Sequence, residues 1–347
     1  MQYRPLGRTD IQVSRICFGI MTFGEQNPEA EAFEMMDLSL DMGVNFYDTA
    51  EMYSFPSRPE TQGDSERALG NWMAARGNRD RIIVATKITG PDDANFAHVR
   101  NGDLSFGAKQ LADAVDQSLQ RLKTDYIDLY QLHWPERTMN SFGQLDYEHK
   151  EEETWTAFED VLETLGRMVD AGKIRAIGCS NESPWGLMKM LGLAESNGLA
   201  RMVSIQNPYN LLNRTFEIGL SEVVIREDCG LLAYSPLAFG VLSGKYLNGA
   251  RPEKARLTIY PQYARYNKPR GIKATEAYVA LAAEHGLDPA QMALAYVNTR
   301  RFTTSNIIGA TTVEQLESNI LSDDLVLSDS VLDGIEMIHT MDANPAP

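Results

Sequence analysis

Short apolar segments alternate with helix-forming segments about eight times along this chain of 347 residues. The expected strands cover residues 14–19, 44–48, 81–86, 125–133, 174–179, 202–206, 231–234 and 305–308. Because these strands are almost continuously apolar, both faces of their sheet should be covered, as in parallel sheets with helices between the strands. Eight such units in a chain of this length predict an α/β fold of the (β/α)8 TIM-barrel class rather than a doubly wound sheet.

Helix-forming segments separate the expected strands. They cover residues 29–42, 65–76, 108–122, 155–171, 184–196, 216–226, 273–285, 289–300, 313–320 and 328–339. In residues 108–122 the apolar residues recur at spacings of three and four, which is the period of a helix with one buried face. No change of composition marks a boundary, so we expect residues 1–347 to form a single barrel domain.

Two features lie outside the regular alternation. Residues 2–14 contain two short stretches around Gly7 and the Thr9-Asp10 pair, which are typical turn residues, so they predict an N-terminal β-hairpin that closes the bottom of the barrel. Long loops are expected at residues 54–64, 88–107, 134–153 and 238–270. Such loops in compact domains are often functional, and we expect the first three to set the choice of substrate.

The composition excludes several classes of partner. The formal net charge is −16, and no basic run is interleaved with aromatic residues, so neither nucleic acid nor a membrane surface is an expected partner. No run of 18 apolar residues predicts a membrane span, and the first ten residues lack the apolar core of a secretory signal. Cys17, Cys179 and Cys229 lie in apolar runs without a CxxC motif, which favours inert thiols in a reducing compartment, the cytoplasm.

Polar side chains stand at the ends of several expected strands. They are Asp48, Lys87, His133, Asn181, Gln206 and Tyr234, with Tyr53 in the loop after the second strand. Singly, each has an ordinary interpretation: a turn cap for Asp48, Asn181 and Gln206, a loop-edge tyrosine, a surface lysine and a strand-end histidine. In a barrel, however, the carboxyl ends of all strands face one mouth, where the chemistry is carried out. Convergence of so many polar groups on one mouth favours a functional site.

These residue types suit the protonation of a carbonyl oxygen. A free tyrosine titrates near pH 10, and a neighbouring Lys87 ammonium should lower the pKa of Tyr53, while Asp48 holds the lysine charged. His133 is suited to hydrogen-bond the oxygen on which negative charge grows. The reaction also needs an electron source, and neither a metal-ligand cluster nor a GxGxxG motif is present in the sequence. Asn181 and Gln206 could hold a carboxamide, and Tyr234 could stack on a flat ring.

Motifs along nearly the whole chain resemble those of the aldo-keto reductase family. They are GIMTFG (19–24), NFYDTAEMY (45–53), ATK (85–87), SLQRLKTDYIDLYQLHWP (118–135), GKIRAIGCSN (172–181), IQNPYNLLNR (205–214), YSPLAFGVLSGKY (234–246) and IIGATTVEQLESN (307–319). The resemblance implies a catalytic tetrad of Asp48, Tyr53, Lys87 and His133, with Tyr53 as the general acid. The last motif resembles the bacterial and potassium-channel β-subunit branch of the family more than the mammalian aldose-reductase branch.

The resemblance also implies a nicotinamide cofactor. Its carboxamide would be held by Ser180, Asn181 and Gln206, with Tyr234 stacked on the ring. The pyrophosphate would be lined by Ser235, Pro236, Leu237, Gly240, Leu242, Gly244 and Lys245, and the adenine end would contact Gln315 and Asn319. Where the mammalian branch holds the 2′-phosphate with a Lys-Ser pair and an arginine, this chain has Gly309, Ala310 and Gln315. Arg256 matches an arginine that the channel-subunit branch uses on that phosphate, so NADPH is the expected cofactor and NADH the alternative; an exposed loop arginine is the other interpretation of Arg256.

The sequence thus predicts NADPH-dependent reduction of aldehydes or ketones to alcohols, with hydride from the nicotinamide and a proton from Tyr53. Trp134 would shape the substrate pocket or pack on the barrel rim. A cofactor-sensing regulatory protein with little turnover is the alternative on the same scaffold, and a flavin-dependent barrel is the third. The expected partner is a small-molecule carbonyl substrate, no metal is expected, and the natural substrate, protein partners and oligomeric state are left open.

Overall fold

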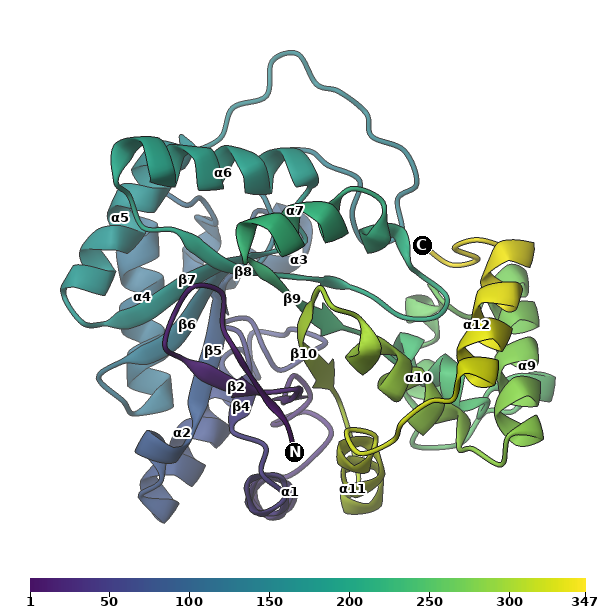
Figure 1. Cartoon of the computed structure of the whole chain (residues 1–347). Helices are drawn as coiled ribbons and strands as arrows, with labels where there is room; N and C mark the ends of the chain where they lie inside the picture. Colours follow the sequence, from purple (N-terminus) through teal and green to yellow (C-terminus); the bar gives the residue numbers. More distant parts are fainter.

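The computed structural model describes residues 1–347, apart from the side chains of residues 93 and 94. Eight parallel strands form a closed barrel in which each strand pairs with the next along the chain and the last pairs with the first. These strands are β3 (Ile16–Gly19), β4 (Phe46–Asp48), β5 (Ile83–Ile88), β6 (Ile127–Leu132), β7 (Ile174–Ser180), β8 (Met202–Pro208), β9 (Gly230–Tyr234) and β10 (Thr303–Ile308). The predicted (β/α)8 barrel is therefore confirmed (Figure 1).

Helices surround the barrel on its outer face (Figure 1). They are α1 (Glu29–Asp41), α2 (Asp64–Arg76), α3 (Asp93–Phe96), α4 (Ala108–Leu122), α5 (Phe158–Asp170), α6 (Pro184–Asn197), α7 (Leu220–Glu227), α8 (Arg256–Ile259), α9 (Pro269–Glu284), α10 (Pro289–Thr299), α11 (Val313–Leu321) and α12 (Asp329–Met341). Nine of the ten expected helices are present, with ends shifted by a few residues. Their apolar stripes pack on the strands in one continuous core.

Four expectations about local structure were wrong in detail. The helix predicted at 216–226 is divided into a 3₁₀ turn, Thr215–Glu217, and α7, because Gly219 between them has a φ of 94°. The loop predicted at 88–107 contains α3 and a second 3₁₀ turn, Val99–Gly102, and the excursion at 238–270 contains α8. Lys87, expected just beyond its strand, lies within β5.

The N-terminal hairpin closes one end of the barrel, as predicted. Its strands β1 (Tyr3–Pro5) and β2 (Gln12–Ser14) pair antiparallel, and the turn between them lies across the barrel opening in Figure 1. Leu6, Ile11 and Val13 are buried against the inner side chains of the barrel strands. A Cβ on Gly7 would lie 2.5 Å from the carbonyl oxygen of Val203, so only glycine permits this close approach.

The inside of the barrel changes from apolar to polar along the strands. One apolar residue from each strand forms the layer next to the hairpin: Cys17, Phe46, Ala85, Leu129, Ala176, Val203, Leu232 and Ile307. Side chains on one face of a strand recur every second residue. Two residues beyond Phe46, Ala85 and Leu129, the inward positions are therefore occupied by Asp48, Lys87 and Gln131, and this polar layer lies toward the mouth.

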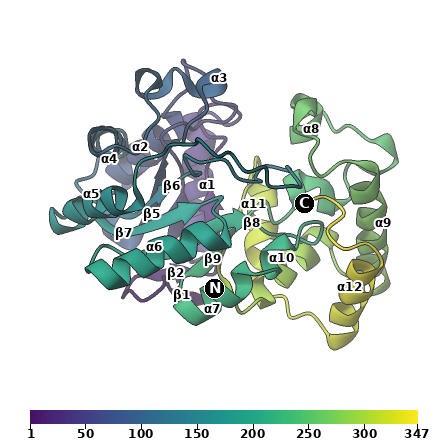
Figure 2. The same cartoon turned by 90° about the horizontal axis from the view of Figure 1, so that it is seen from above.

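The mouth lies at the end of the barrel opposite the hairpin. In Figure 2, α3 and α8 lie at this end, and the hairpin lies at the other. The segment between β6 and α5 extends far beyond the barrel in Figure 1, and Gly143 in this segment approaches the side chain of Arg265 in the excursion after β9. Among the helices that the structure describes, none is long and apolar enough to cross a membrane.

Candidate active site

A buried ion pair lies at the centre of the polar layer. The Lys87 ammonium donates to Asp48 Oδ2 at 2.5 Å and to the carbonyl of Thr49 at 2.8 Å, and its side chain has no exposed surface. Burial by itself would lower the pKa of Lys87, but the Asp48 carboxylate, together with Tyr53, outweighs burial and raises it. The lysine therefore remains a cation inside the barrel.

Two glutamines complete the surroundings of Asp48. Gln206 Nε2 donates to Asp48 Oδ1 at 2.8 Å and to Gln131 Oε1 at 3.2 Å. Gln131 Nε2 also donates to Asp48 Oδ1, at 3.3 Å. Asp48 thus receives hydrogen bonds from β5, β6 and β8, which fixes the carboxylate that holds the lysine.

The Tyr53 phenol lies above this pair. Its hydroxyl is 3.4 Å from Nε2 of His133, and Lys87 Nζ lies 5.1 Å from the centroid of the Tyr53 ring. Tyr53 is almost fully buried, and the His133 ring meets its ring edge-on at 5.5 Å. The four residues of the predicted tetrad therefore lie side by side: Asp48 in β4, Lys87 in β5, His133 directly after β6 and Tyr53 in the loop after β4.

The protonation of Tyr53 differs from the sequence-based expectation. Burial raises the pKa of the phenol above 10.0, and the Lys87 ammonium opposes this rise without reversing it. The expectation that Lys87 would bring the tyrosine pKa below its ordinary value was wrong, because the loss of water around the phenolate outweighs one nearby cation. Tyr53 is consequently a neutral phenol at neutral pH and carries the proton that a general acid must donate.

His133 is also neutral. Burial and then the charge of Lys87 lower the pKa of its imidazole well below 6.5. Its Nδ1 is buried and has no hydrogen-bond partner among the described residues, while Nε2 faces the Tyr53 hydroxyl. A neutral imidazole presents one donor and one acceptor, so Nε2 can donate to an oxygen placed beside Tyr53.

The residues predicted to hold a carboxamide come from the neighbouring strands β7, β8 and β9. Asn181 Nδ2 donates to the carbonyl of His133 at 2.9 Å, and Tyr234 donates from its hydroxyl to Asn181 Oδ1 at 2.6 Å. Ser180 Oγ donates to the carbonyl of Gln206 at 2.7 Å. These groups lie together beside the tetrad, but the amides of Asn181 and Gln206 have protein partners that a carboxamide would replace.

The segment after β9 has an unusual backbone. Five of its residues have φ between 50° and 85°: Ser235, Ala238, Phe239, Gly240 and Gly244. Left-handed residues beside right-handed ones can form a concave group of peptide N–H donors that binds anions. Here the N–H groups of Ala238, Gly240 and Gly244 donate within the segment. A Cβ on Gly240 would lie 2.8 Å from Nζ of Lys245, so the glycine leaves room for this ammonium. The predicted pyrophosphate residues, including Pro236, Leu237 and Leu242, all lie in or beside this stretch.

Two cations near this segment have no carboxylate partner within the described part of the chain: Lys245 and Arg256. Burial lowers the pKa of both side chains. The Arg256 guanidinium is half-buried and lies 4.2 Å from the centroid of the Phe239 ring and 5.9 Å from that of Phe55. Two unpaired cations in and near this segment fit the phosphates of a dinucleotide.

The last three predicted cofactor residues, Gly309, Gln315 and Asn319, lie in α11 and in the loop before it. Asn319 Nδ2 donates to the carbonyl of Gly309 at 3.2 Å, and Gln315 accepts from the backbone N–H of Thr311 at 3.2 Å. They follow β10, which pairs with β9. The candidate site is therefore divided by strand: the tetrad comes from β4 to β6, and the predicted cofactor residues come from β7 to β10.

An apolar collar surrounds the phenol. Tyr53 packs with Val99 and Leu104 from the β5–α4 segment, and the half-buried side chains Met21, Phe55, Phe96 and Trp134 pack against this cluster. The Trp134 ring lies 4.8 Å from that of His133, and its Nε1 donates to the carbonyl of Pro91 at 3.0 Å. Trp134 thus contacts both the tetrad and a long loop.

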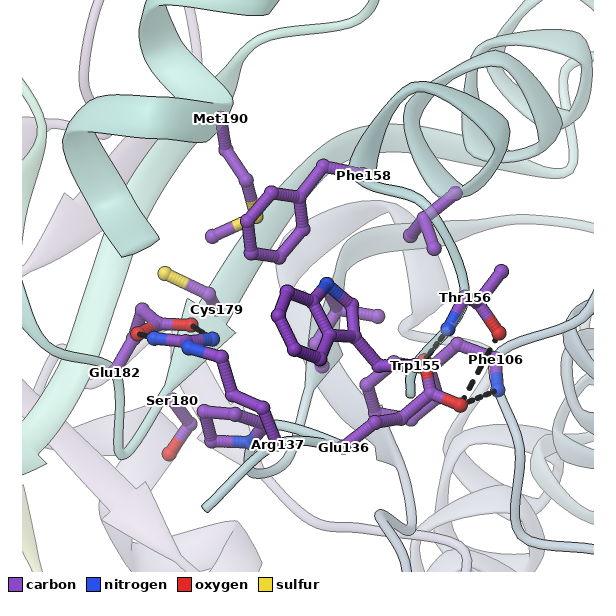
Figure 3. A pocket seen from close by; sticks show the side chains of 13 residues that line it. Phe106, Glu136, Arg137, Trp155, Thr156, Phe158, Cys179, Ser180, Glu182 and Met190 are labelled. Carbon is purple, nitrogen blue, oxygen red and sulfur yellow. Dashed lines mark hydrogen bonds and ion pairs between the residues drawn. The ribbon is translucent and has the colours of Figure 1, made fainter. Parts of the chain in front are cut away.

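A separate cleft lies beside the mouth, between the β6–α5 segment, β7 and α6 (Figure 3). It is lined mainly by apolar side chains around Trp155. Its charged groups are already paired: Arg137 with Glu182, and Glu136 with the backbone N–H groups of Phe106 and Thr156. We therefore attribute this cleft to loop packing rather than to the chemistry at Tyr53.

Three buried residues near the tetrad were missed from the sequence: Gln131, Glu51 and Arg100. Gln131 is two residues before His133, so strand alternation could have placed it inside the barrel. Glu51 is a charged residue within the apolar run AEMY, which was a signal of a buried carboxylate. Arg100 carried no signal in the sequence. As for metals, the described residues contain no group of three or more His, Cys, Asp or Glu side chains placed to hold an ion.

Comparison with known proteins identifies the family. The sequence model of the Aldo/keto reductase family matches residues 15–339. The protein tas of Escherichia coli (strain K12) is 48% identical over 347 residues, the full length of both chains. Norsolorinic acid reductase stcV of Emericella nidulans is 32% identical over 341 residues, which cover 94% of this chain and 78% of the relative. The probable voltage-gated potassium channel subunit beta of Arabidopsis thaliana is 29% identical over 349 residues, or 97% and 96% of the two chains. The chain therefore belongs to the Aldo/keto reductase family and is an NAD(P)H-dependent oxidoreductase.

Proposed function

We propose that this protein reduces aldehydes or ketones to alcohols with NADPH, and that Tyr53 is the general acid. The observation that carries the proposal is the position of one neutral phenol: it lies 3.4 Å from a neutral imidazole and above a buried lysine–aspartate pair. NADPH, when bound, supplies a hydride to the carbonyl carbon. The residues of the chain then have to place the oxygen, stabilise its growing charge and protonate it.

Each member of the tetrad has a separate task. Tyr53 gives its proton to the carbonyl oxygen, and Lys87, held charged by Asp48, stabilises the phenolate that this transfer leaves behind. His133 donates a hydrogen bond from Nε2 to the same oxygen. Because His133 is neutral, it orients the oxygen without competing with Tyr53 as a strong acid.

For the cofactor, we propose that Ser180, Asn181 and Gln206 bind the carboxamide and that Tyr234 packs on the ring. The left-handed segment after β9 and Lys245 would bind the pyrophosphate, and Arg256 the 2′-phosphate. The adenine end would meet Gly309, Gln315 and Asn319. The unpaired charge of Arg256 supports NADPH over NADH, because only NADPH carries the 2′-phosphate.

The substrate is proposed to be a small apolar carbonyl compound. The collar of Met21, Phe55, Phe96 and Trp134 offers aromatic and thioether surface next to the phenol. A relative named norsolorinic acid reductase supports turnover of an organic substrate by reduction in this family. Because all three cysteines are free and buried, we propose the cytoplasm as the location.

The test is a fluorescence titration with NADPH and NADH, followed by steady-state oxidation of NADPH with a panel of simple aldehydes and ketones. We expect tighter binding of NADPH and measurable turnover with apolar aldehydes. Tight binding without turnover across the panel would instead favour a cofactor-sensing regulator, the alternative suggested by the relative named as a channel β-subunit. A yellow purified protein would indicate a flavin and contradict both.

A further inference from the structure

The buried carboxylate of Glu51 lies between two members of the tetrad along the chain. It is two residues before Tyr53, and its side chain is 1% exposed. The backbone N–H of Glu51 donates to the carbonyl of Lys87 at 3.1 Å, which continues the pairing of β4 with β5. At this residue the chain leaves the sheet, because the next turn is closed by a bond from the N–H of Tyr53 to the carbonyl of Ala50.

The Glu51 side chain replaces a backbone group in the sheet. In a regular parallel pair, the N–H of Thr89 would donate to the backbone carbonyl of Glu51. That carbonyl accepts instead from Gln62 Nε2, and the N–H of Thr89 donates to Glu51 Oε1 at 2.6 Å. Glu51 therefore binds the chain at two successive points, through its backbone N–H to the carbonyl of Lys87 and through its carboxylate to the N–H of Thr89, just beyond β5.

Arg100 completes this arrangement from the opposite loop. Its Nε donates to Glu51 Oε1 at 3.2 Å, and its Nη2 donates to the carbonyl of Thr89 at 2.8 Å. Nη1 donates to the carbonyls of Asp103 and Ser105. The arginine side chain is 2% exposed, so the guanidinium is fixed inside the loop that provides Val99 and Leu104 to the collar of Tyr53.

From this geometry we propose that Glu51 and Arg100 are a positioning pair, which sets the Tyr53 phenol relative to the Lys87 ammonium. The inference rests on the proposed function. Among the described contacts, neither residue hydrogen-bonds the Tyr53 hydroxyl. Glu51 fixes the start of the turn that carries Tyr53, and Arg100 fixes the backbone at Thr89, two residues after Lys87. A buried pair with directed hydrogen bonds is suited to this task, because loss of either partner leaves the other charge without compensation. Small displacements of catalytic groups reduce rates strongly.

The test compares variants of Glu51 with a matched control. Glu51→Ala removes both the Thr89 bond and the Arg100 pair, whereas Glu51→Gln keeps an acceptor for Thr89 and loses the charge. The control is Glu66→Gln, because Glu66 is equally buried and pairs with Arg121 at 2.5 Å between α2 and α4. Its other oxygen accepts from the hydroxyl of Thr86, whose side chain lies on the face of β5 opposite to that of Lys87. We expect kcat for carbonyl reduction to fall roughly 10- to 100-fold in Glu51→Ala and less in Glu51→Gln. In the Glu51 variants, the Kd for NADPH should stay within about twofold of the value for the natural chain. In Glu66→Gln, kcat should stay within about twofold of the kcat of the natural chain.

A second readout needs no turnover. In protein labelled with ¹³C at the tyrosine ring carbon that bears the hydroxyl, the Tyr53 resonance is assigned by its loss in Tyr53→Phe. We expect this resonance to move in Glu51→Ala and Glu51→Gln and to stay in place in Glu66→Gln. Equal kcat in Glu51→Ala and Glu66→Gln would overturn the proposal, and so would an unmoved Tyr53 resonance. If the natural chain reduces no carbonyl compound, the proposed function fails, and the resonance alone decides whether the pair positions Tyr53.

Discussion

The two ends of the barrel are built from the same strands but have opposite interiors. Next to the hairpin, the inward side chains of β4, β5 and β6 are Phe46, Ala85 and Leu129, which pack with Leu6, Ile11 and Val13. Two residues further along, the inward side chains are Asp48, Lys87 and Gln131. Lys87 and Gln131 both donate to Asp48, and Gln206 donates to Asp48 and to Gln131. One step of the strand period therefore separates a hydrophobic plug from a charged site.

The difference shows how stability and chemistry are separated in this chain. Burial of apolar side chains at the hairpin end favours folding, and these side chains need no hydrogen-bond or ion-pair partner. At the mouth, a buried ammonium is tolerated only because Asp48 and the Thr49 carbonyl accept from it and two glutamines fix Asp48. Substitutions at the two ends should therefore fail in different ways.

The largest effect is expected from Lys87→Met. It removes the cation and leaves the Asp48 carboxylate buried without its partner, which should lower the free energy of unfolding by about 3–5 kcal/mol and abolish turnover. Urea denaturation and NADPH oxidation measure the two effects. The double variant Asp48→Asn with Lys87→Met should regain part of the stability and none of the activity. Equal stability of the single and double variants would contradict this account of the pair.

Leu6→Ala is the corresponding change at the hairpin end. Leu6 has no exposed surface, so truncation should lower the free energy of unfolding by about 2–5 kcal/mol. Because Leu6 lies in the apolar layer and contacts no tetrad residue, kcat of the folded fraction should be unchanged. Stability comes from the same denaturation curves, and a large loss of kcat at a temperature where the variant is folded would show that the two ends are coupled.

Much of this comparison could be predicted from the sequence, because it depends on periodicity. The apolar strands, the helices between them and the polar strand ends are local patterns, so the barrel, the hairpin and the proximity of Asp48, Tyr53, Lys87 and His133 followed from them. The network around Asp48 could not be predicted, because the partners of Gln206 come from β4 and β6 and depend on the barrel's closed geometry. The role of Arg100 was also hidden, since it reaches Glu51 from 49 residues away.

The pKa of Tyr53 shows a different limit of sequence reasoning. The neighbouring cation was visible in the motif, but the extent of burial was not, and burial has the larger effect. A quantity that balances two opposing terms cannot be derived from a pattern that contains only one of them.

A smaller effect is expected from Arg256→Met. This variant tests whether the mouth is divided between the tetrad and the predicted cofactor residues. If Arg256 binds the 2′-phosphate, the Kd for NADPH should rise roughly 10- to 100-fold, the range for loss of a charge-assisted hydrogen bond. The Kd for NADH should change by less than about twofold, and kcat at saturating cofactor should be kept. Fluorescence titration measures both constants. An equal rise in Kd for NADPH and NADH would contradict the proposal that Arg256 binds the 2′-phosphate.

The smallest effect is the expected response to pH. Because the pKa of His133 lies well below 6.5 and that of Tyr53 above 10.0, kcat/KM for reduction should be flat between these values and fall above the second as Tyr53 loses its proton. The pKa of Lys87 is raised on folding, so its pair stabilises the fold below pH 10.5 and that stability is lost as pH rises through the raised value. Steady-state assays across pH measure kcat/KM, and thermal unfolding across pH measures the stability. A change of kcat/KM centred near pH 7 would contradict the assignment of Tyr53 as the acid and of His133 as neutral.

The central claim is that Tyr53 delivers the proton, and Tyr53→Phe tests it most directly. The substitution keeps the ring and its packing in the collar and removes only the hydroxyl. The account predicts that kcat for carbonyl reduction falls by about 10²–10⁴-fold, while the Kd for NADPH stays within about twofold of the natural chain. Near-normal turnover in Tyr53→Phe would contradict the account.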